Sequence, residues 1–329
     1  MSRPVAAIDC GTNTIKLLVG AMSDHEGLDV AVREMRMVRL GQDLDRTGRI
    51  AEEALGRAFA AIDEYAELVR AHGVPVERIR FCATSATRDA TNADEFVAGV
   101  RERLGVVPEV VTGAEEAALA FDGAVRNLRT PAAAPVLVVD IGGGSTELIL
   151  GELILDSAGQ DPAHQIRGHS MNIGSVRLHE RHLTDDPPTP AQVAACVADI
   201  EAHLDACPVD AGAAATVVGV AGTVTTVAAA VLDLPAYDRD ALDQAVIAVD
   251  AVHAAVDRLV AMTHGERRAL GFMHPGRADV IDAGALILSA VLRRTRAEHL
   301  VVSESDILDG IAWSIAGRTP GPDTASITP

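Results

Sequence analysis

Two stretches of the chain follow the same pattern: AIDCGTNTIKLL at residues 7–18 and VVDIGGGSTELI at residues 138–149. Each is an apolar run that ends in an aspartate, passes through glycine and small hydroxyl residues, and returns to an apolar run. Two apolar, β-rich runs that flank a short polar segment containing glycine predict a β-hairpin. The sequence therefore predicts two hairpins of the same design.

The tips of both hairpins are predicted to bind phosphate. Backbone N–H groups converge at such a tip, and glycine lets the main chain approach an anion with no Cβ in the way. Asp9 and Asp140 end the first strand of each hairpin, where a carboxylate can hold Mg²⁺ directly or through water. The predicted phosphate contacts are Gly11, Thr12, Asn13 and Thr14 at the first tip and Gly142, Gly143, Gly144, Ser145 and Thr146 at the second.

A third stretch, GVAGTVTT at residues 219–226, predicts a strand that runs into a helix. Gly222 and Thr223 then lie at the helix N-terminus, where free N–H groups and a hydroxyl favour an anion. Taken alone, a glycine-rich turn after a strand is usually an ordinary turn, and the third stretch is explained as well by a plain strand-to-helix turn. Their occurrence together favours a phosphate site, with one hairpin in each of two domains and a cleft between them.

Strand-like and helix-like runs alternate along the chain, which indicates an α/β fold with ligands at the sheet edges. Thr189 and Pro190 fit the N-cap and first position of a helix at residues 191–206. The predicted strands of the first half cover residues 5–8, 15–20, 30–38, 79–83 and 107–111, and its predicted helices cover residues 52–72, 92–104 and 114–128.

Length and composition indicate a soluble globular protein. A chain of 329 residues is long enough for two domains, and with 48% hydrophobic but 2% aromatic residues its cores must consist of Ala, Val, Leu and Ile. No apolar run reaches the roughly 18 residues of a membrane span, and Asp9 and Asn13 interrupt the first run, so no signal peptide is predicted. The four cysteines show no metal-ligand spacing, which fits reduced thiols in the cytoplasm.

The charge of the chain restricts its partners. A formal net charge of −19 argues against sequence-independent nucleic-acid binding, which needs a basic face. Any phosphate ligand must therefore be held by a local pocket. Lys16 is the single lysine among the 28 basic residues, so almost every cation is a guanidinium.

The motifs together resemble the actin, hexokinase and Hsp70 ATPase superfamily and, within it, the exopolyphosphatase and guanosine pentaphosphatase (Ppx/GppA) family. The most specific matches are DIGGGSTEL at residues 140–148, ATSATRDATN at 83–92 and TGAEEA at 112–117. The resemblance implies two ribonuclease H-like domains: residues 1–128 plus 300–317 form domain I, and residues 129–299 form domain II. Residues 318–329 are expected to be a disordered tail.

The resemblance also implies a reaction, which is hydrolysis of the terminal phosphoanhydride of inorganic polyphosphate or of the 5′ γ-phosphate of pppGpp. Glu116 in TGAEEA is then the base that activates water, with Glu115 as the neighbouring alternative. Adjacent helix residues point about 100° apart, so one of the two can face the cleft. A solvated acidic first turn is the plain alternative for this pair.

The implied cofactor is Mg²⁺ or Mn²⁺, held by Asp140 and Glu147 with help from Asp9; a monovalent cation such as K⁺ is a further possibility. Lys16 and Arg88 are implied phosphate contacts. The expected partners are inorganic polyphosphate, guanosine alarmones and a second copy of the chain in a homodimer. Four more arginines are candidates for a basic channel that holds the rest of a polyphosphate chain: Arg177, Arg181, Arg267 and Arg277.

The chain departs from the family pattern at several points. Lys16 stands where the family usually has arginine, and the last motif, VSESDILDG at residues 302–310, also differs. The chain has no His-Asp dipeptide of the kind expected from a further phosphohydrolase domain, so we expect the short, two-domain form and a preference for shorter polyphosphates. An ATP-dependent kinase and a non-catalytic sensor of polyphosphate or (p)ppGpp are the alternative functions.

Overall fold

The first predicted hairpin opens a five-stranded sheet. The computed structural model of the chain describes residues 4–22, 28–126, 128, 132–152 and 165–316. In this sheet the strand order is β3-β2-β1-β4-β5, and β1 runs antiparallel to β2 and parallel to β4. The strands are β1 (Pro4–Cys10), β2 (Thr14–Met22), β3 (Leu28–Met37), β4 (Ile79–Ala83) and β5 (Glu109–Val110).

The second predicted hairpin opens a second sheet. Its strands are β6 (Val136–Ile141), β7 (Thr146–Glu152), β8 (Gln165–Met171), β9 (Thr216–Val220), β10 (Val246–Ala248) and β11 (His299–Val302). The order β8-β7-β6-β9-β11 repeats that of the first sheet, and β10 is added at the edge. The register repeats as well, because Asp9 pairs with Lys16 in the first hairpin and Asp140 pairs with Glu147 in the second. The predicted α/β fold of two related units is confirmed.

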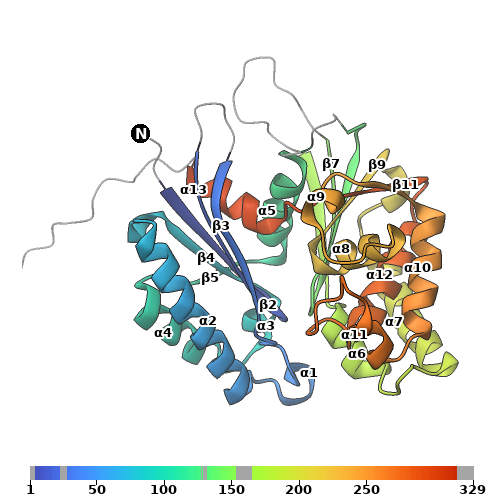
Figure 1. Cartoon of the computed structure of the whole chain (residues 1–329), viewed down its shortest axis with the longest axis horizontal. Coiled ribbons are helices and arrows are strands. Elements are labelled where there is room, and N and C mark those ends of the chain that lie inside the picture. Colours follow the sequence, from blue (N-terminus) through green and yellow to red (C-terminus); the bar gives the residue numbers. More distant parts are fainter. Residues whose placement is uncertain (1–3, 23–27, 127, 129–131, 153–164, 317–329) are drawn as a thin grey trace, which may run out of the picture.

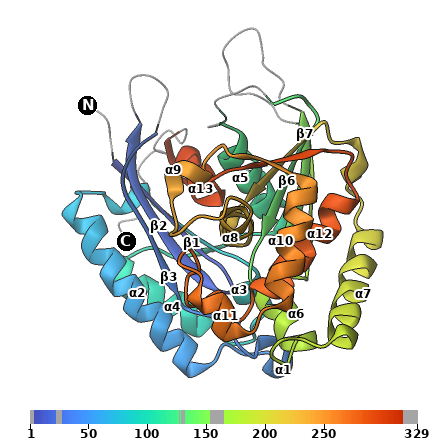
Figure 2. The same ribbon diagram turned by 45° about the vertical axis from the view of Figure 1, so that its right-hand side comes forward.

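Two helices, α5 (Gly113–Arg126) and α13 (Ile307–Ala316), lie between the sheets (Figure 1). One buried cluster joins them to both sheets, and it includes Ala7 and Leu18 of the first and Val138 and Val220 of the second. Helices α2 (Glu52–Ala71) and α4 (Ala93–Leu104) cover the outer face of the first sheet. The outer layer of the second unit consists of α6 (Ser175–His182), α7 (Pro190–Ala206), α8 (Ala221–Val231), α10 (Val249–Ala261) and α12 (Ile281–Arg293) (Figure 2).

The remaining described elements are single turns that connect the larger ones. They are α1 (Leu44–Thr47), α3 (Ser85–Asp89), α9 (Arg239–Leu242), α11 (His264–Ala269) and the 3₁₀ turns at Val76–Arg78 and Ala211–Ala213. The predicted start of α7 is confirmed: the Thr189 side chain accepts a hydrogen bond from the Gln192 N–H in a capping box, and Pro190 is the first helical residue.

The chain returns from the second unit to the first near its C-terminal end. Strand β11 pairs with β9 in the second sheet, whereas α13 packs against α5 and β1. We therefore propose that the boundary at which the chain leaves domain II and re-enters domain I lies after Val302 rather than at residue 300. The expected tail at residues 318–329 lies outside the described residues. None of the described helices combines the length and the apolar character that crossing a membrane requires.

Helices α5 and α13 cross in close contact because each has a glycine at the crossing. A Cβ on Gly123 would lie 1.9 Å from the carbonyl oxygen of Asp306, and one on Gly310 would lie 2.0 Å from that of Leu119. Both partners are backbone atoms, so a side chain at either position must push the helices apart.

We expect Gly123→Ala and Gly310→Ala each to lower the free energy of unfolding by about 1–3 kcal/mol or more, because both changes overpack the helix contact. Gly56→Ala in α2 is the matched control, since its Cβ would meet nothing within 4 Å. That control should stabilise the protein by up to about 1 kcal/mol, the helix propensity gain of alanine over glycine. Urea unfolding of the three variants measures the difference, and equal stabilities would contradict the crossing.

Candidate active site

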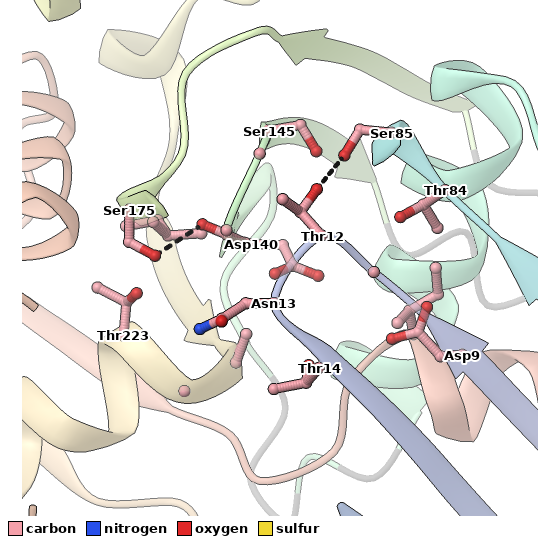
Figure 3. Close-up of a pocket in the computed structure, with 18 of the residues that line it drawn as sticks. Asp9, Thr12, Asn13, Thr14, Thr84, Ser85, Asp140, Ser145, Ser175 and Thr223 are labelled. Atoms are coloured by element: carbon pink, nitrogen blue, oxygen red, sulfur yellow. Dashed lines mark hydrogen bonds between the residues drawn. The ribbon is translucent and has the colours of Figure 1, made fainter. Parts of the chain in front are cut away.

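The two hairpin tips meet at a pocket of about 80 Å³ between the two units (Figure 3). Every predicted site residue except Arg88 and Thr146 lines it, namely Asp9, Gly11, Thr12, Asn13, Thr14, Lys16, Glu116, Asp140, Gly142, Gly143, Gly144, Ser145, Glu147, Gly222 and Thr223. The pocket thus collects side chains and backbone from β1, β2, α5, β6, β7 and α8.

The tips have the same hydrogen bond and touch each other. The N–H of Gly11 donates to the Thr14 carbonyl at 2.9 Å, and the N–H of Gly142 donates to the Ser145 carbonyl at 3.0 Å. Across the cleft, a Cβ on Gly144 would lie 2.3 Å from the Thr12 hydroxyl oxygen. The absence of a side chain at this glycine therefore allows the two phosphate loops to close around the pocket.

Four buried carboxylates line the pocket, those of Asp9, Glu116, Asp140 and Glu147. Burial raises the pKa of Asp9 to about 6 and those of Glu116 and Asp140 to about 7, since the charged form loses hydration. Burial also raises the pKa of Glu147 well above its usual value, with repulsion from Glu116 and Asp140 as the next causes. The charged forms of these four acids are therefore disfavoured in the pocket.

Of the two adjacent glutamates, Glu116 lines the pocket and Glu115 does not. Arg88 donates from Nη1 to Oε2 of Glu116 at 3.1 Å and to the Val111 carbonyl at 2.8 Å. Glu115 instead forms an ion pair with Arg80 at 2.7 Å, and its side chain is 45% exposed. In this structure the Arg88 guanidinium thus holds Glu116, and its contact with phosphate stays a prediction.

Thr146 also does not line the pocket. Its side chain is fully buried, and its hydroxyl donates to the carbonyl of Ile173 at 2.7 Å. The hydroxyl therefore ties the second tip to the segment before α6 rather than facing a ligand.

Lys16 lines the pocket but is paired with carboxylates. Its Nζ lies 2.6 Å from Oδ2 of Asp306 and 3.5 Å from Oδ2 of Asp9. Burial alone would lower the pKa of the Lys16 ammonium, but Asp306 and Asp9 raise it by more, so it stays charged. Asp306, which forms the shorter of these two ion pairs with Lys16, lies in the divergent motif at residues 302–310.

The four arginines predicted to line a channel do not lie together in the structure. Arg177 pairs with Asp45 at 3.1 Å and Asp89 at 2.9 Å, across the two units, and Arg181 pairs with Asp45 at 2.9 Å. Arg267 is buried in the second unit at 1% exposure and pairs with Asp282. A channel role for Arg267 is therefore wrong, since its guanidinium is a core group.

Arg277 lies at the end of the pocket beside the third motif. Its Nη1 lies 3.5 Å from the Gly222 carbonyl oxygen and from the Thr226 hydroxyl. A Cβ on Gly222 would lie 2.3 Å from this guanidinium, so the glycine makes room for the arginine. Burial lowers the pKa of Arg277, and no described carboxylate lies within ion-pair distance of it. This guanidinium is thus available to an anion.

A second cavity of about 430 Å³ adjoins the pocket and shares Lys16, Gly222 and Arg277 with it. Met35, Leu308, Tyr237, Phe272 and Met273 give it a largely apolar surface, and charged residues, among them Arg33, Glu34 and Glu304, also line it. The pocket therefore opens, past Arg277, into a larger and less polar space.

The residues present fit a divalent metal ion. Mg²⁺ takes oxygen ligands and usually binds through one or two carboxylates, substrate phosphates and several waters. Asp9, Asp140 and Glu147 offer such oxygens and all three line the same pocket. Within the described residues, no three His, Cys, Asp or Glu side chains form a ready-made metal cluster. The donors thus suit an ion that shares its coordination with phosphate.

The fold has two α/β units and is of the actin-like ATPase type. Buried acids and two phosphate-loop tips meet in the cleft between the units. This combination defines an enzyme that acts on phosphate groups. The chain belongs to the Ppx/GppA phosphatase family, whose model matches residues 18–319. Phosphatases of this family generally depend on a metal ion. The expected family and fold are therefore confirmed.

Similar proteins cover nearly the whole chain. Exopolyphosphatase 2 of Mycobacterium tuberculosis is 45% identical over 328 residues, which span 95% of this chain and 98% of that protein. The crystal structure of an exopolyphosphatase-like protein matches with a TM-score of 0.88 at 44% identity, over 95% of this chain and 97% of that one. A Ppx/GppA family member from Aquifex aeolicus matches with a TM-score of 0.78 at 29% identity, over 96% and 98% of the two chains.

The pocket also contains hydroxyl groups that the sequence did not single out, those of Thr84, Ser85 and Ser175. Ser85 shares a hydrogen bond of 2.8 Å with Thr12 and so joins α3 to the first tip (Figure 3). Thr84 and Ser85 belong to the ATSATRDATN motif, which was interpreted through its arginine alone. The presence of Thr and Ser at the end of a predicted strand was the signal that could have identified them.

Proposed function

We propose that this protein is an exopolyphosphatase, which hydrolyses the terminal phosphoanhydride of inorganic polyphosphate and releases orthophosphate. The observation that carries the proposal is the position of Glu116, whose carboxylate lines a small pocket walled by two phosphate-loop tips. Its neighbour Glu115 faces away from the pocket. The 45% identity to a protein named exopolyphosphatase supports polyphosphate as the substrate.

In the proposed reaction, Glu116 accepts a proton from a water whose oxygen attacks the terminal phosphorus. The bond from that phosphorus to the bridging oxygen breaks, and the shortened chain leaves with the bridging oxygen. A base with a pKa of about 7 suits this step near neutral pH, and Arg88 orients its carboxylate. The backbone N–H groups and hydroxyls of the two tips hold the phosphate oxygens in place.

Asp140 and Glu147, with Asp9, are the residues that would hold Mg²⁺ or Mn²⁺, and K⁺ is a possible monovalent addition. A divalent ion supplies neutralisation of charge on the phosphate oxygens. The cytoplasmic location and the homodimer that the family implies stay predictions, and light scattering of the purified protein tests the second.

We also propose that shorter polyphosphates are the better substrates. A long polyanion needs free cations along its path, but Arg177 and Arg181 on α6 are already paired with Asp45 and Asp89. The net charge of −19 further repels a long chain. We expect kcat/KM per chain end to be higher for short than for long polyphosphate, and the difference to shrink as added salt screens the repulsion. Faster hydrolysis of long chains at low salt would contradict this.

The second cavity favours an alternative substrate, guanosine pentaphosphate. A phosphate chain that passes Arg277 would place an attached base near Tyr237 and Phe272. The deciding experiment measures phosphate release with Mg²⁺ from polyphosphates of defined length, pppGpp and ATP, without any acceptor. Release mainly from polyphosphate supports the exopolyphosphatase, and faster release from pppGpp, weakened by Phe272→Ala, supports the alarmone phosphatase. Binding without release from any substrate would support a sensor, and release only with an acceptor would support a kinase.

A further inference from the structure

A row of three polar residues crosses the second sheet beside the pocket. Asp140 on β6 pairs with Glu147 on β7, and Glu147 pairs with Ser170 on β8. The Ser170 hydroxyl donates to Oε1 of Glu147 at 2.6 Å. Asp140 and Glu147 line the pocket, whereas Ser170 does not. Ser170 thus contacts an acid of the site from behind.

The helix that carries Glu116 lies directly on this end of β8. A Cβ on Gly113, the first residue of α5, would lie 2.8 Å from the Cβ of Ser170. One turn later, a Cβ on Gly168 would lie 2.7 Å from the Cβ of Ala117. Glycine at both contacts therefore lets the helix and the strand touch, and Ser170 has little room to move.

We propose that Ser170 is a positioning residue that fixes the Glu147 carboxylate for metal binding. Its hydroxyl occupies Oε1, which restrains the orientation of the carboxylate. A hydrogen bond to a carboxylate is among the stronger ones in proteins. The inference rests on the proposed function, in which Glu147 is a metal ligand.

Ser145 also donates a hydrogen bond to Glu147, but its role is different. Ser145 lines the pocket at the second tip, where substrate phosphate competes for its hydroxyl. Ser170 lies outside the pocket, so its hydrogen bond to Glu147 persists whether or not substrate is bound. The restraint on Glu147 is therefore built into the sheet.

The test measures Mn²⁺ binding by electron paramagnetic resonance, with and without inorganic phosphate, because the donors suit an ion that shares its coordination with phosphate. Hydrogen-bond partners of metal ligands typically change affinity 10–100-fold, so we expect Ser170→Ala to raise the Mn²⁺ Kd by about tenfold or more. In activity assays the same variant should need more Mg²⁺ for half-maximal rate, while kcat at saturating Mg²⁺ falls much less. Ser289→Ala in α12 is the matched control, since it removes a buried hydroxyl that lies 2.8 Å from Nδ1 of His253 in α10, and it should leave the Kd unchanged.

A second variant tests the same contact without removing the Ser170 hydroxyl. Gly113→Ala crowds Ser170 without removing any polar group and should also weaken Mn²⁺ binding. An unchanged Mn²⁺ Kd in folded Ser170→Ala, with binding abolished in Glu147→Gln, would overturn the inference and leave the metal site intact. Unchanged binding in Glu147→Gln would instead overturn the metal assignment itself, and the role of Ser170 with it.

Discussion

Replacement of Glu116 by glutamine is expected to lower kcat on polyphosphate by about 10²–10⁴-fold, the usual contribution of a general base. The amide keeps the shape of the side chain but cannot take a proton from water. Phosphate release at saturating substrate measures the loss. Substrate binding should change little, because the two tips that hold the phosphate are untouched.

Glu115→Gln is the control for this change, since it makes the same substitution one residue earlier. Glu115 is half-exposed and paired with Arg80, so its loss should leave kcat close to that of the wild type. The pH profile is a second check. Burial raises the pKa of Glu116 to about 7, so kcat/KM should rise as the base deprotonates through that pH. A large loss of kcat in Glu115→Gln, together with normal activity in Glu116→Gln, would make Glu115 the base instead of Glu116.

Asp140→Asn is expected to reduce kcat/KM by about 10³-fold, because a metal ion supplies several kcal/mol of charge stabilisation. The same variant should be more stable than the wild type when metal is absent. Burial, with repulsion from Asp306 and Asp9, raises the pKa of Asp140 from 3.8 to about 7. Above pH 7 the buried charge on Asp140 therefore lowers the free energy of unfolding, and asparagine does not carry this charge.

The pH dependence of this stability gain follows from the direction of the shift. A carboxyl whose pKa is raised on folding is neutral in both states below about pH 4, where the variant and the wild type should melt together. The gain should grow from pH 4 to pH 7 and then level off. Calorimetry in EDTA measures it, and a lower Tm for Asp140→Asn at pH 8 would contradict the argument.

Asp282→Asn provides a comparison of opposite sign. Asp282 is 1% exposed and pairs with the buried Arg267 at 2.9 Å. Removal of one partner leaves an uncompensated buried charge, which costs about 3–5 kcal/mol. Two asparagine substitutions at buried aspartates should thus move Tm in opposite directions, because Asp282 pairs with a buried arginine, whereas burial and the repulsion from Asp306 and Asp9 disfavour the charge on Asp140.

The hairpins and their acids were predictable because their cause is local. An apolar run, a glycine turn and a second run specify a hairpin without reference to the rest of the chain, and the registers of Asp9 with Lys16 and of Asp140 with Glu147 follow. The start of α7 at Thr189 was predictable for the same reason. The family resemblance added Glu116, which no local pattern distinguishes from Glu115.

The partners of the charged residues could not be predicted, because they lie far apart in the sequence. Lys16 meets Asp306 only after α13 has returned to the first unit, and Arg177 meets Asp89 only across the cleft. Arg267 has the same side chain as the others, yet it is a core residue. Burial and ion pairing in the folded state decide which cation can bind a ligand, and the spacing of residues in a sequence motif predicts neither.

The two units match in strand order and register, but Lys16 occupies the place in one hairpin that Glu147 occupies in the other. With identical charges at both places, the paired positions of the two hairpins would treat the two ends of a linear phosphate chain alike. The exchange of a cation for an anion makes them differ, in the same sense as Glu116 and the cavity beside Arg277. It gives the cleft a polarity, so the chain enters with a leading end and a trailing end.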